Sequence, residues 1–407
     1  MIGPKVSLFI VSRHRTAELL QAIKAVQLQD YTPLELIVVA DPSAAAAVLA
    51  LGLPIKVAPF DLANVAAARN TGLAFAAGEL VAYLDDDAVP EPTWISRLVA
   101  PFANPQVGVA TGFVRGRNGI SDQWRACDVD QFGWDHLVSV DRLSMTLLSG
   151  SPTKAIKAQG TNCAFRWADV MAVGGFDEGF PFYLDDADIS LRLAALGGLT
   201  AVVPEAVVQH GFAASIRRRP DRVPHSLQDI GASSAYFLRR HARGCDMPAQ
   251  YKAHHHAQQT RLTRQMIIGA IEPRDVGSLL ASFSKGWAEG LVQDLWQPKK
   301  PNGQAVDFLQ LPTEKRVGLL LVGRLWQRRN LLRQAGVEAT LGKIVTVICL
   351  SPTTWYHRHK FESAGYWVQQ GGVYGQSVRE GMPVKFSGFS ARLRQETARI
   401  GRTRPTD

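Results

Sequence analysis

One decapeptide, Val81-Ala-Tyr-Leu-Asp-Asp-Asp-Ala-Val-Pro90, constrains the fold of this chain more than any other segment. Its four mostly apolar residues are few enough to form a strand that is buried in a parallel sheet. Three carboxylates, Asp85, Asp86 and Asp87, follow at the carboxyl end of that strand, where open α/β sheets place their ligands. Adjacent anions repel one another unless a positive charge neutralises them. A divalent cation, Mg²⁺ or Mn²⁺, suits these oxygen ligands, although a solvated acidic turn would have the same sequence.

Strand and helix patterns alternate on the amino-terminal side of this turn. Apolar runs predict strands over residues 6–12, 34–40, 55–59 and 80–84. Periodic or Ala-rich segments predict helices over residues 17–28, 43–51 and 64–77. The alternation predicts an α/β fold with a doubly wound, mostly parallel sheet that is flanked by helices. No GxGxxG motif follows the first strand, so a dinucleotide cofactor is not expected.

Composition narrows the class of protein and its partners. The formal net charge of +9 favours an anionic partner such as a nucleotide or an acidic lipid headgroup. The four cysteines are far apart in the sequence, which argues against a zinc site or a disulfide scaffold. No apolar run reaches the length of a membrane span, and the first residues lack the apolar core of a signal peptide. These features predict a cytoplasmic protein.

Several segments together resemble the nucleotide-binding half of family 2 glycosyltransferases. Residues of this chain that match the family pattern, in order, are Val6–Arg15, Val38–Ser43, Ala67–Gly72, Ala77–Glu79, and Tyr83–Pro90 with Trp94. The resemblance extends over roughly residues 4–240 and implies a GT-A fold that uses a nucleoside-diphosphate sugar as donor.

The resemblance also implies roles for individual residues. Asp85 and Asp87 are expected to bind the cation, Mn²⁺ or Mg²⁺, and Asp86 to contact the ribose. His210, at the end of the apolar run 202–209, is expected as a further metal ligand, since imidazole suits Mn²⁺; a lone histidine is otherwise more often structural. Further substrate-binding candidates are Ser12, Arg13, Asp41, Arg69, Asn70 and Asp185. For Arg13, Asp41 and Arg69, an ordinary surface charge is an equally good interpretation.

A second acidic segment supplies the candidate catalytic residue. Gly174-Gly-Phe-Asp-Glu178 precedes Asp185 and Asp186, which match the acidic pair that the family places at the start of a helix. Transfer with inversion needs a base that takes a proton from the acceptor hydroxyl, and we expect Asp186 to be that base. A purely structural carboxylate at the helix start is the alternative. For Asp188 we prefer that structural interpretation, with Arg192 as its partner four residues later.

Two segments depart from the family pattern. Ser12-Arg13-His14 and Ala40-Asp41-Pro42-Ser43 stand where the family usually has other residues around the nucleotide base. The identity of the base therefore stays open among uracil, guanine and thymine, with a UDP-sugar favoured.

The rest of the chain is less informative. We expect three parts: a glycosyltransferase domain over 1–240, a helical extension over 241–297, and a small α/β appendage with a basic tail over 303–407. Residues 116–155 show no clear period, and we interpret them as loop and helix over the site. We interpret His254-His-His256 as part of an exposed polar helix, and the tail Phe386–Asp407 as frayed or in contact with anionic lipid.

The function that these features predict is an inverting glycosyltransferase. Its acceptor would be a saccharide or a lipid-linked saccharide, in bacterial polysaccharide or cell-surface glycan synthesis. Peripheral contact with the inner face of the plasma membrane would suit the basic surface. A metal-dependent nucleotidyltransferase is the alternative, since it also pairs aspartates with a metal. Nucleic acid is not an expected partner, because the acidic turn opposes a phosphate polymer and no nucleic-acid-binding motif is present.

Overall fold

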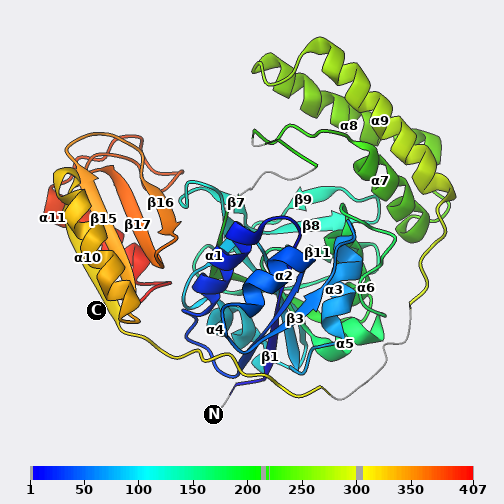
Figure 1. Ribbon diagram of the computed structural model, residues 1–407. Coiled ribbons are helices and arrows are strands. Elements are labelled where there is room, and N and C mark those ends of the chain that lie inside the picture. Colours follow the sequence, from blue (N-terminus) through cyan, green and yellow to red (C-terminus); the bar gives the residue numbers. More distant parts are fainter. Residues whose placement is uncertain (1–2, 212–216, 220, 299–305, 407) are drawn as a thin grey trace.

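The computed structural model describes residues 3–211, 217–219, 221–298 and 306–406 (Figure 1). Within this part of the chain, the main sheet has ten strands, eight of which lie in the order β10-β13-β6-β12-β4-β1-β2-β3. Those eight are β1 (Val6–Ser12), β2 (Leu34–Ala40), β3 (Ile55–Pro59), β4 (Leu80–Asp85), β6 (Val107–Arg115), β10 (Thr146–Ser149), β12 (Cys163–Arg166) and β13 (Leu199–His210). The short strand β5 (Ala88–Pro90) pairs with β13, and β7 (Asp122–Trp124) pairs with β6.

The sheet is mostly parallel. Strands β3, β2, β1 and β4 pair in parallel, and so do β6 and β13. Strand β12 is antiparallel to both β4 and β6, so these two strands run in the same direction. The α/β class and the mostly parallel sheet that the sequence predicted are therefore confirmed.

Helices cover both faces of the sheet, because successive side chains of each strand point to opposite faces. Leu8 and Ile10 of β1 pack with α1 (Thr16–Val26), α2 (Pro42–Leu49) and α4 (Trp94–Val99). A short 3₁₀ turn over Ala100–Ala103 follows α4. Phe9 packs on the other face, with α3 (Val65–Leu73), α5 (Trp167–Ala172) and α6 (Asp185–Ala194). The side chain of Asn64 caps α3, which is shorter than the predicted 64–77. This is the doubly wound arrangement.

The segment after β6 differs from the sequence prediction. Residues 116–155 contain strands rather than a helix: β7, β8 (Cys127–Asp130), β9 (Asp135–Leu137), β10 and the start of β11 (Lys154–Ile156). Strands β11, β8 and β9 form a small antiparallel sheet. Strands of three or four residues are too short to show a hydrophobic period, so the sequence pattern does not reveal them.

Three helices project from the main sheet: α7 (Gln228–His241), α8 (Met247–Ile267) and α9 (Pro273–Val292) (Figure 1). Helices α7 and α9 cross so closely that a Cβ atom at Gly286 would lie 1.9 Å from the Gln228 carbonyl oxygen. The interpretation of His254 as an exposed residue is wrong. Its ring is buried and stacks on Trp134 at 4.1 Å between centroids, because a loop of the main domain packs against α8.

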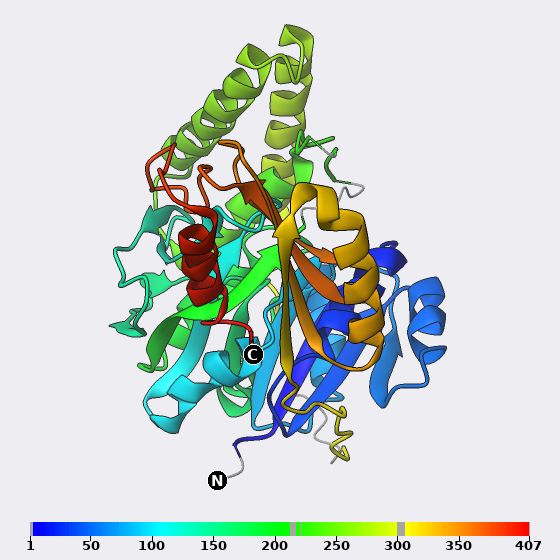
Figure 2. The same cartoon turned by 90° about the vertical axis from the view of Figure 1, so that its left-hand side faces the viewer.

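The carboxyl-terminal part forms a third sheet, ordered β14-β15-β17-β16, whose strands are Gly318–Arg324, Ile344–Ser351, Tyr366–Gly372 and Arg358–Glu362. A 3₁₀ turn (Leu325–Gln327) leads into α10 (Arg328–Thr340), which covers one face, while α11 (Phe389–Ile400) covers the other (Figure 2). Ile344 and Trp367 pack against Ala25 of α1, so the sheet contacts the main domain.

The prediction of a frayed tail is wrong. Residues 389–400 are helical, and Arg404 beyond them is buried in an ion pair with Glu91 of the main domain. The pattern could not reveal this contact because its two partners are 313 residues apart. The division into three domains stays a prediction. Among the described residues, no helix is long and apolar enough to cross a membrane.

Candidate active site

The acidic turn lies at the carboxyl edge of the main sheet, beside the end of β13. Strand β5 pairs with β13 so that Ala88 lies opposite His210, which brings the imidazole to the aspartates. His210 Nε2 lies 3.1 Å from an Asp87 oxygen and 3.7 Å from an Asp85 oxygen. One ligand atom from each of these three residues lies within 4.8 Å of the other two. His210 Nδ1 is 3.1 Å from Gln123 Oε1, and this contact orients the ring.

The donor set of Asp85, Asp87 and His210 fits a divalent cation. Two carboxylate oxygens and one imidazole nitrogen suit Mn²⁺, and the carboxylates suit Mg²⁺. Asp85 is about two-fifths exposed, so the position faces the cavity that a substrate would enter. The structure thus brings the three predicted ligands together.

Asp86 points elsewhere and belongs to a buried network. It accepts a hydrogen bond from Ser12 Oγ at 2.7 Å and pairs with Arg15 at 2.9 Å. Burial raises the pKa of Asp86 to about 7, although Arg15 opposes the rise. Arg15 also reaches Asp87 at 3.4 Å and thereby offsets part of the repulsion within the turn. Sequence reasoning noted Arg15 after the first strand without assigning it a role at the site.

A cavity of about 440 Å³ opens at this edge of the sheet. It brings together nine of the predicted site residues from five elements or their ends. These lining residues are Ser12, Arg13, Arg69, Asp85, Asp86, Asp87, Asp185, Asp186 and His210.

Two predicted substrate-binding residues do not line the cavity. Asp41 caps α2 by accepting a hydrogen bond from the Ala44 N–H, and it also accepts one from the His14 N–H. Asn70 bonds to both backbone groups of Phe176 and to the Glu178 carboxylate, so it fastens α3 to the loop before α6. Both side chains bond to backbone groups next to the site. That they contact substrate stays a prediction.

The candidate base, Asp186, faces a lysine that sequence reasoning missed. Lys157 Nζ lies 3.7 Å from Asp186 Oδ1 and 3.2 Å from both oxygens of Asp135. Burial alone would lower the pKa of Lys157, but Asp186 and Asp135 outweigh it and raise the pKa above its ordinary value. Lys157 follows one of the short strands that the sequence pattern did not predict, so no signal placed it near α6. Asp186 therefore lies beside a buried positive charge.

Helix α6 holds both predicted acids at its first turn. Leu184 precedes it with φ of +67°, and Asp185 then forms an ion pair with Arg69 of α3. Burial raises the pKa of Asp185, although Arg69 opposes the rise. The Arg69 guanidinium also lies 5.1 Å from the centre of the Phe176 ring. This pairing fixes the start of α6 against the main sheet.

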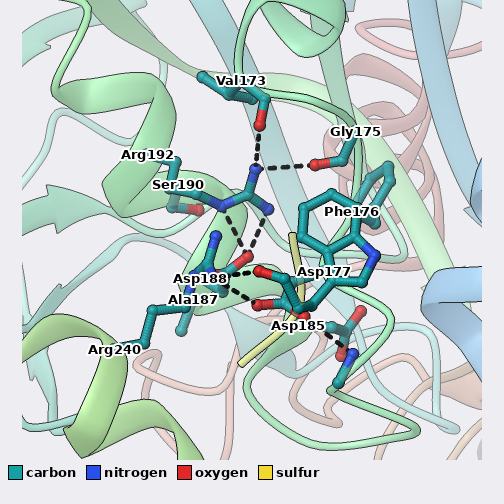
Figure 3. Close-up of polar contacts among 12 residues, drawn as sticks. Val173, Gly175, Phe176, Asp177, Asp185, Ala187, Asp188, Ser190, Arg192 and Arg240 are labelled. Carbon is teal, nitrogen blue, oxygen red and sulfur yellow. Dashed lines mark hydrogen bonds and ion pairs between the residues drawn. The ribbon is translucent and has the colours of Figure 1, made fainter. Parts of the chain in front are cut away.

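A buried network anchors the next turn of α6 (Figure 3). Arg192 Nε donates to Asp188 at 2.9 Å, and Arg240 from α7 pairs with the other oxygen of Asp188 at 3.0 Å. Arg192 also donates to the Val173 and Gly175 carbonyl oxygens. Burial opposes ionisation of Asp188, but Arg192 and His241 outweigh it and lower its pKa to about 2. The pairing of Asp188 with Arg192 that the sequence predicted is confirmed.

Part of this chain is similar in sequence to known proteins. Residues 7–167 match the family model described as glycosyl transferase family 2. Pre-mycofactocin glycosyltransferases of two Mycobacterium tuberculosis strains are 28% identical over 195 residues, which cover 42% of this chain and 39% of theirs. The chain thus spans about two-fifths of the length of the curated relatives that it matches.

Solved structures were compared as well. Mannosyltransferase PcManGT from Pyrobaculum calidifontis, in complex with GDP-Man and Mn²⁺, has a TM-score of 0.44 and 18% identity over 71% of this chain and 88% of its own. GalNAc-T7 with UDP, GalNAc and Mn²⁺ has a TM-score of 0.44 and 16% identity over 62% of this chain and 54% of its own. Similarity to glycosyl transferase family 2 is therefore shown for residues 7–167 of this chain.

Proposed function

We propose that this protein transfers a sugar from a nucleoside-diphosphate sugar to a saccharide or lipid-linked saccharide acceptor. One observation carries the proposal: a single cavity holds the Asp85–Asp87–His210 group on one side and the Asp186–Lys157 pair on another. The first is suited to a metal-bound diphosphate and the second to proton abstraction. The match of residues 7–167 to the glycosyl transferase family 2 model supports this proposal.

The acidic turn would serve the donor. Asp85, Asp87 and His210 would hold the cation, which supplies positive charge to the two phosphates as the nucleoside diphosphate leaves. Arg15 forms ion pairs with both Asp86 and Asp87 and so fixes their side chains. Because these side chains are fixed before substrate arrives, little reorganisation is needed during reaction.

Asp186 would act on the acceptor. Its carboxylate is about one-quarter exposed and lines the cavity, and Lys157 Nζ lies 3.7 Å from it. It takes the hydroxyl proton as the acceptor oxygen bonds to the anomeric carbon, and the bond from that carbon to the donor phosphate breaks. A single displacement of this kind inverts the anomeric configuration. Inversion, UDP preference, bacterial glycan synthesis and peripheral membrane contact are all parts of this proposal.

The test separates donor binding from chemistry. Calorimetry with UDP, GDP and TDP, each with Mn²⁺, Mg²⁺ or EDTA, should show metal-dependent binding of one nucleotide, lost in Asp87→Ala. Asp186→Asn should keep that binding but lower the rate of sugar transfer by about 10²–10⁴-fold, the usual contribution of a general base. Asp141→Asn, at an exposed residue outside the cavity, is the matched control. Absence of metal-dependent nucleotide binding in the wild type would overturn the proposal.

A further inference from the structure

A second cleft, of about 580 Å³, lies between the main domain and the carboxyl-terminal sheet. One wall is the turn from β6 to β7, which contributes Arg117 and Asn118. The other wall is the segment around β16, with Tyr356 and Arg358, and the loop after β17, with Arg379. The cleft is distinct from the cavity that holds the acidic turn, since the two share no lining residue among those described.

The lining of this cleft is strongly basic. Arg117, Arg358 and Arg379 contribute three guanidinium groups, and no described lining residue is acidic. Arg358 and Arg379 are exposed, and within the described ranges neither has an ion-pair partner. The nearby Glu380 is already engaged by Arg125 and Arg142. Positive charges that gather in one concave site attract an anion and raise its local concentration.

Hydrogen bonds between the two walls hold the cleft in shape. The His359 N–H donates to the Asn118 carbonyl oxygen at 2.7 Å, and the Gln209 amide donates to the His359 carbonyl oxygen at 3.0 Å. Gly119 has φ of +65°, and a Cβ atom there would lie 2.4 Å from His359 Cβ. Only glycine fits this contact without strain, so the turn is closely seated on β16.

The same turn connects the cleft to the acidic turn. Arg117 Nε donates to the Gly211 carbonyl oxygen at 3.0 Å, and the Gly211 N–H donates to the Asp87 carbonyl oxygen at 2.8 Å. Arg117 therefore lines the cleft and also bonds to the residue that follows the candidate metal ligand His210.

We propose that this cleft binds an anionic group, phosphate or carboxylate, carried by the acceptor saccharide. Guanidinium groups match the planar, two-pronged geometry of such anions. Tyr356 lines the cleft and is 64% exposed, so it offers an aromatic face to a sugar ring. The assignment to the acceptor rests on the proposed function, because it presumes that the neighbouring cavity binds the donor.

The experiment uses the full chain and measures binding by calorimetry. The probes are glucose 6-phosphate, glucuronate, glucose and inorganic phosphate, together with phosphatidylglycerol vesicles. We expect the two anionic sugars to bind more tightly than either glucose or phosphate. The double substitution Arg358→Gln/Arg379→Gln should weaken their binding by about tenfold or more, because both charged guanidinium donors are lost. Arg333→Gln/Arg394→Gln removes the same charge from exposed sites of the same sheet unit and should bind as the wild type does.

The outcomes separate this proposal from the proposed function. Asp87→Ala should abolish nucleotide binding and leave the affinity for glucose 6-phosphate unchanged. If nucleotide binding requires Asp87 but the anionic sugars bind equally to the wild type and to Arg358→Gln/Arg379→Gln, the cleft proposal fails alone. It also fails if no sugar probe binds, if phosphate binds as tightly as the sugar phosphate, or if only the vesicles bind in an arginine-dependent way.

Discussion

The buried pair of Arg404 and Glu91 provides the most quantitative prediction. Arg404 donates through Nε and Nη2 to the two Glu91 oxygens, at 2.5 and 3.0 Å. Its Nη1 donates to Thr346 Oγ1 at 3.2 Å, so all three nitrogens of the guanidinium have partners. The two side chains are 1% and 5% exposed, which means that solvent would not replace a lost partner. We predict that Arg404→Gln destabilises the protein.

The expected magnitude follows from this burial. Removing one partner of a buried ion pair typically costs about 3–5 kcal/mol, because the other charge is left uncompensated. Arg115 lies 3.5 Å from a Glu91 oxygen and retains part of the attraction. We therefore expect the free energy of unfolding to fall by about 3 kcal/mol, at the lower end of that range.

Urea unfolding followed by tryptophan fluorescence would measure this change. Arg402→Gln is the matched control, because Arg402 is exposed and only two residues away, and its effect should be within about 0.5 kcal/mol. Glu91→Gln combined with Arg404→Gln should be less destabilising than the sum of the two single substitutions, because neither charge is then left alone. A loss below about 1 kcal/mol for Arg404→Gln, or strict additivity of the pair, would refute the reasoning.

Three further predictions concern the site and the helices. Lys157→Met removes the cation beside Asp186, so initial-rate kinetics should show kcat reduced about tenfold with nucleotide affinity unchanged; an equal loss of both would contradict the assigned role. Burial lowers the pKa of His254 to about 4, so the unfolded state takes up its proton first, and stability should fall by about 3 kcal/mol as pH drops from 6.5 to 4. Urea unfolding at both pH values should show a smaller fall in His254→Gln, but the full fall in the exposed His256→Gln. Gly286→Ala should lower the melting temperature because its Cβ atom would meet the Gln228 carbonyl oxygen, whereas Gly277→Ala, in open space on the same helix, should raise it; similar shifts in calorimetry would argue against close packing of α7 on α9.

The parts of the site that could be predicted from sequence are those fixed by strand ends. Asp85, Asp87 and His210 each lie at or just after the carboxyl end of a strand, and such ends meet at one edge of a parallel sheet. The pairing of Asp188 with Arg192 was predictable as well, because residues four apart face each other on a helix. Both inferences rest on regular geometry that a short stretch of sequence determines.

The parts that escaped prediction depend on irregular or distant contacts. Lys157, which reaches Asp186, directly follows a strand of three residues that is too short to show a period. His254 is buried because Trp134 and Phe132, which are distant in the sequence, contact its ring. Asp41 and Asn70 were predicted to bind substrate, but their side chains form hydrogen bonds to the backbone of His14 and Phe176. The residue types alone do not specify these partners.

The link between Glu91 and Arg404 also limits how this architecture can be recombined. Glu91 directly follows β5, the strand that aligns His210 with the acidic turn, whereas its guanidinium partner belongs to the carboxyl-terminal unit. A chimera that exchanged residues 306–406 for a foreign module would remove Arg404 and leave Glu91 with the longer contact to Arg115, at 3.5 Å. Fusing residues 306–406 to another protein would instead leave Arg404 without its Glu91 partner. A chimera should therefore keep both Glu91 and Arg404 or replace both with uncharged residues. The carboxyl-terminal unit cannot be exchanged independently of the main sheet.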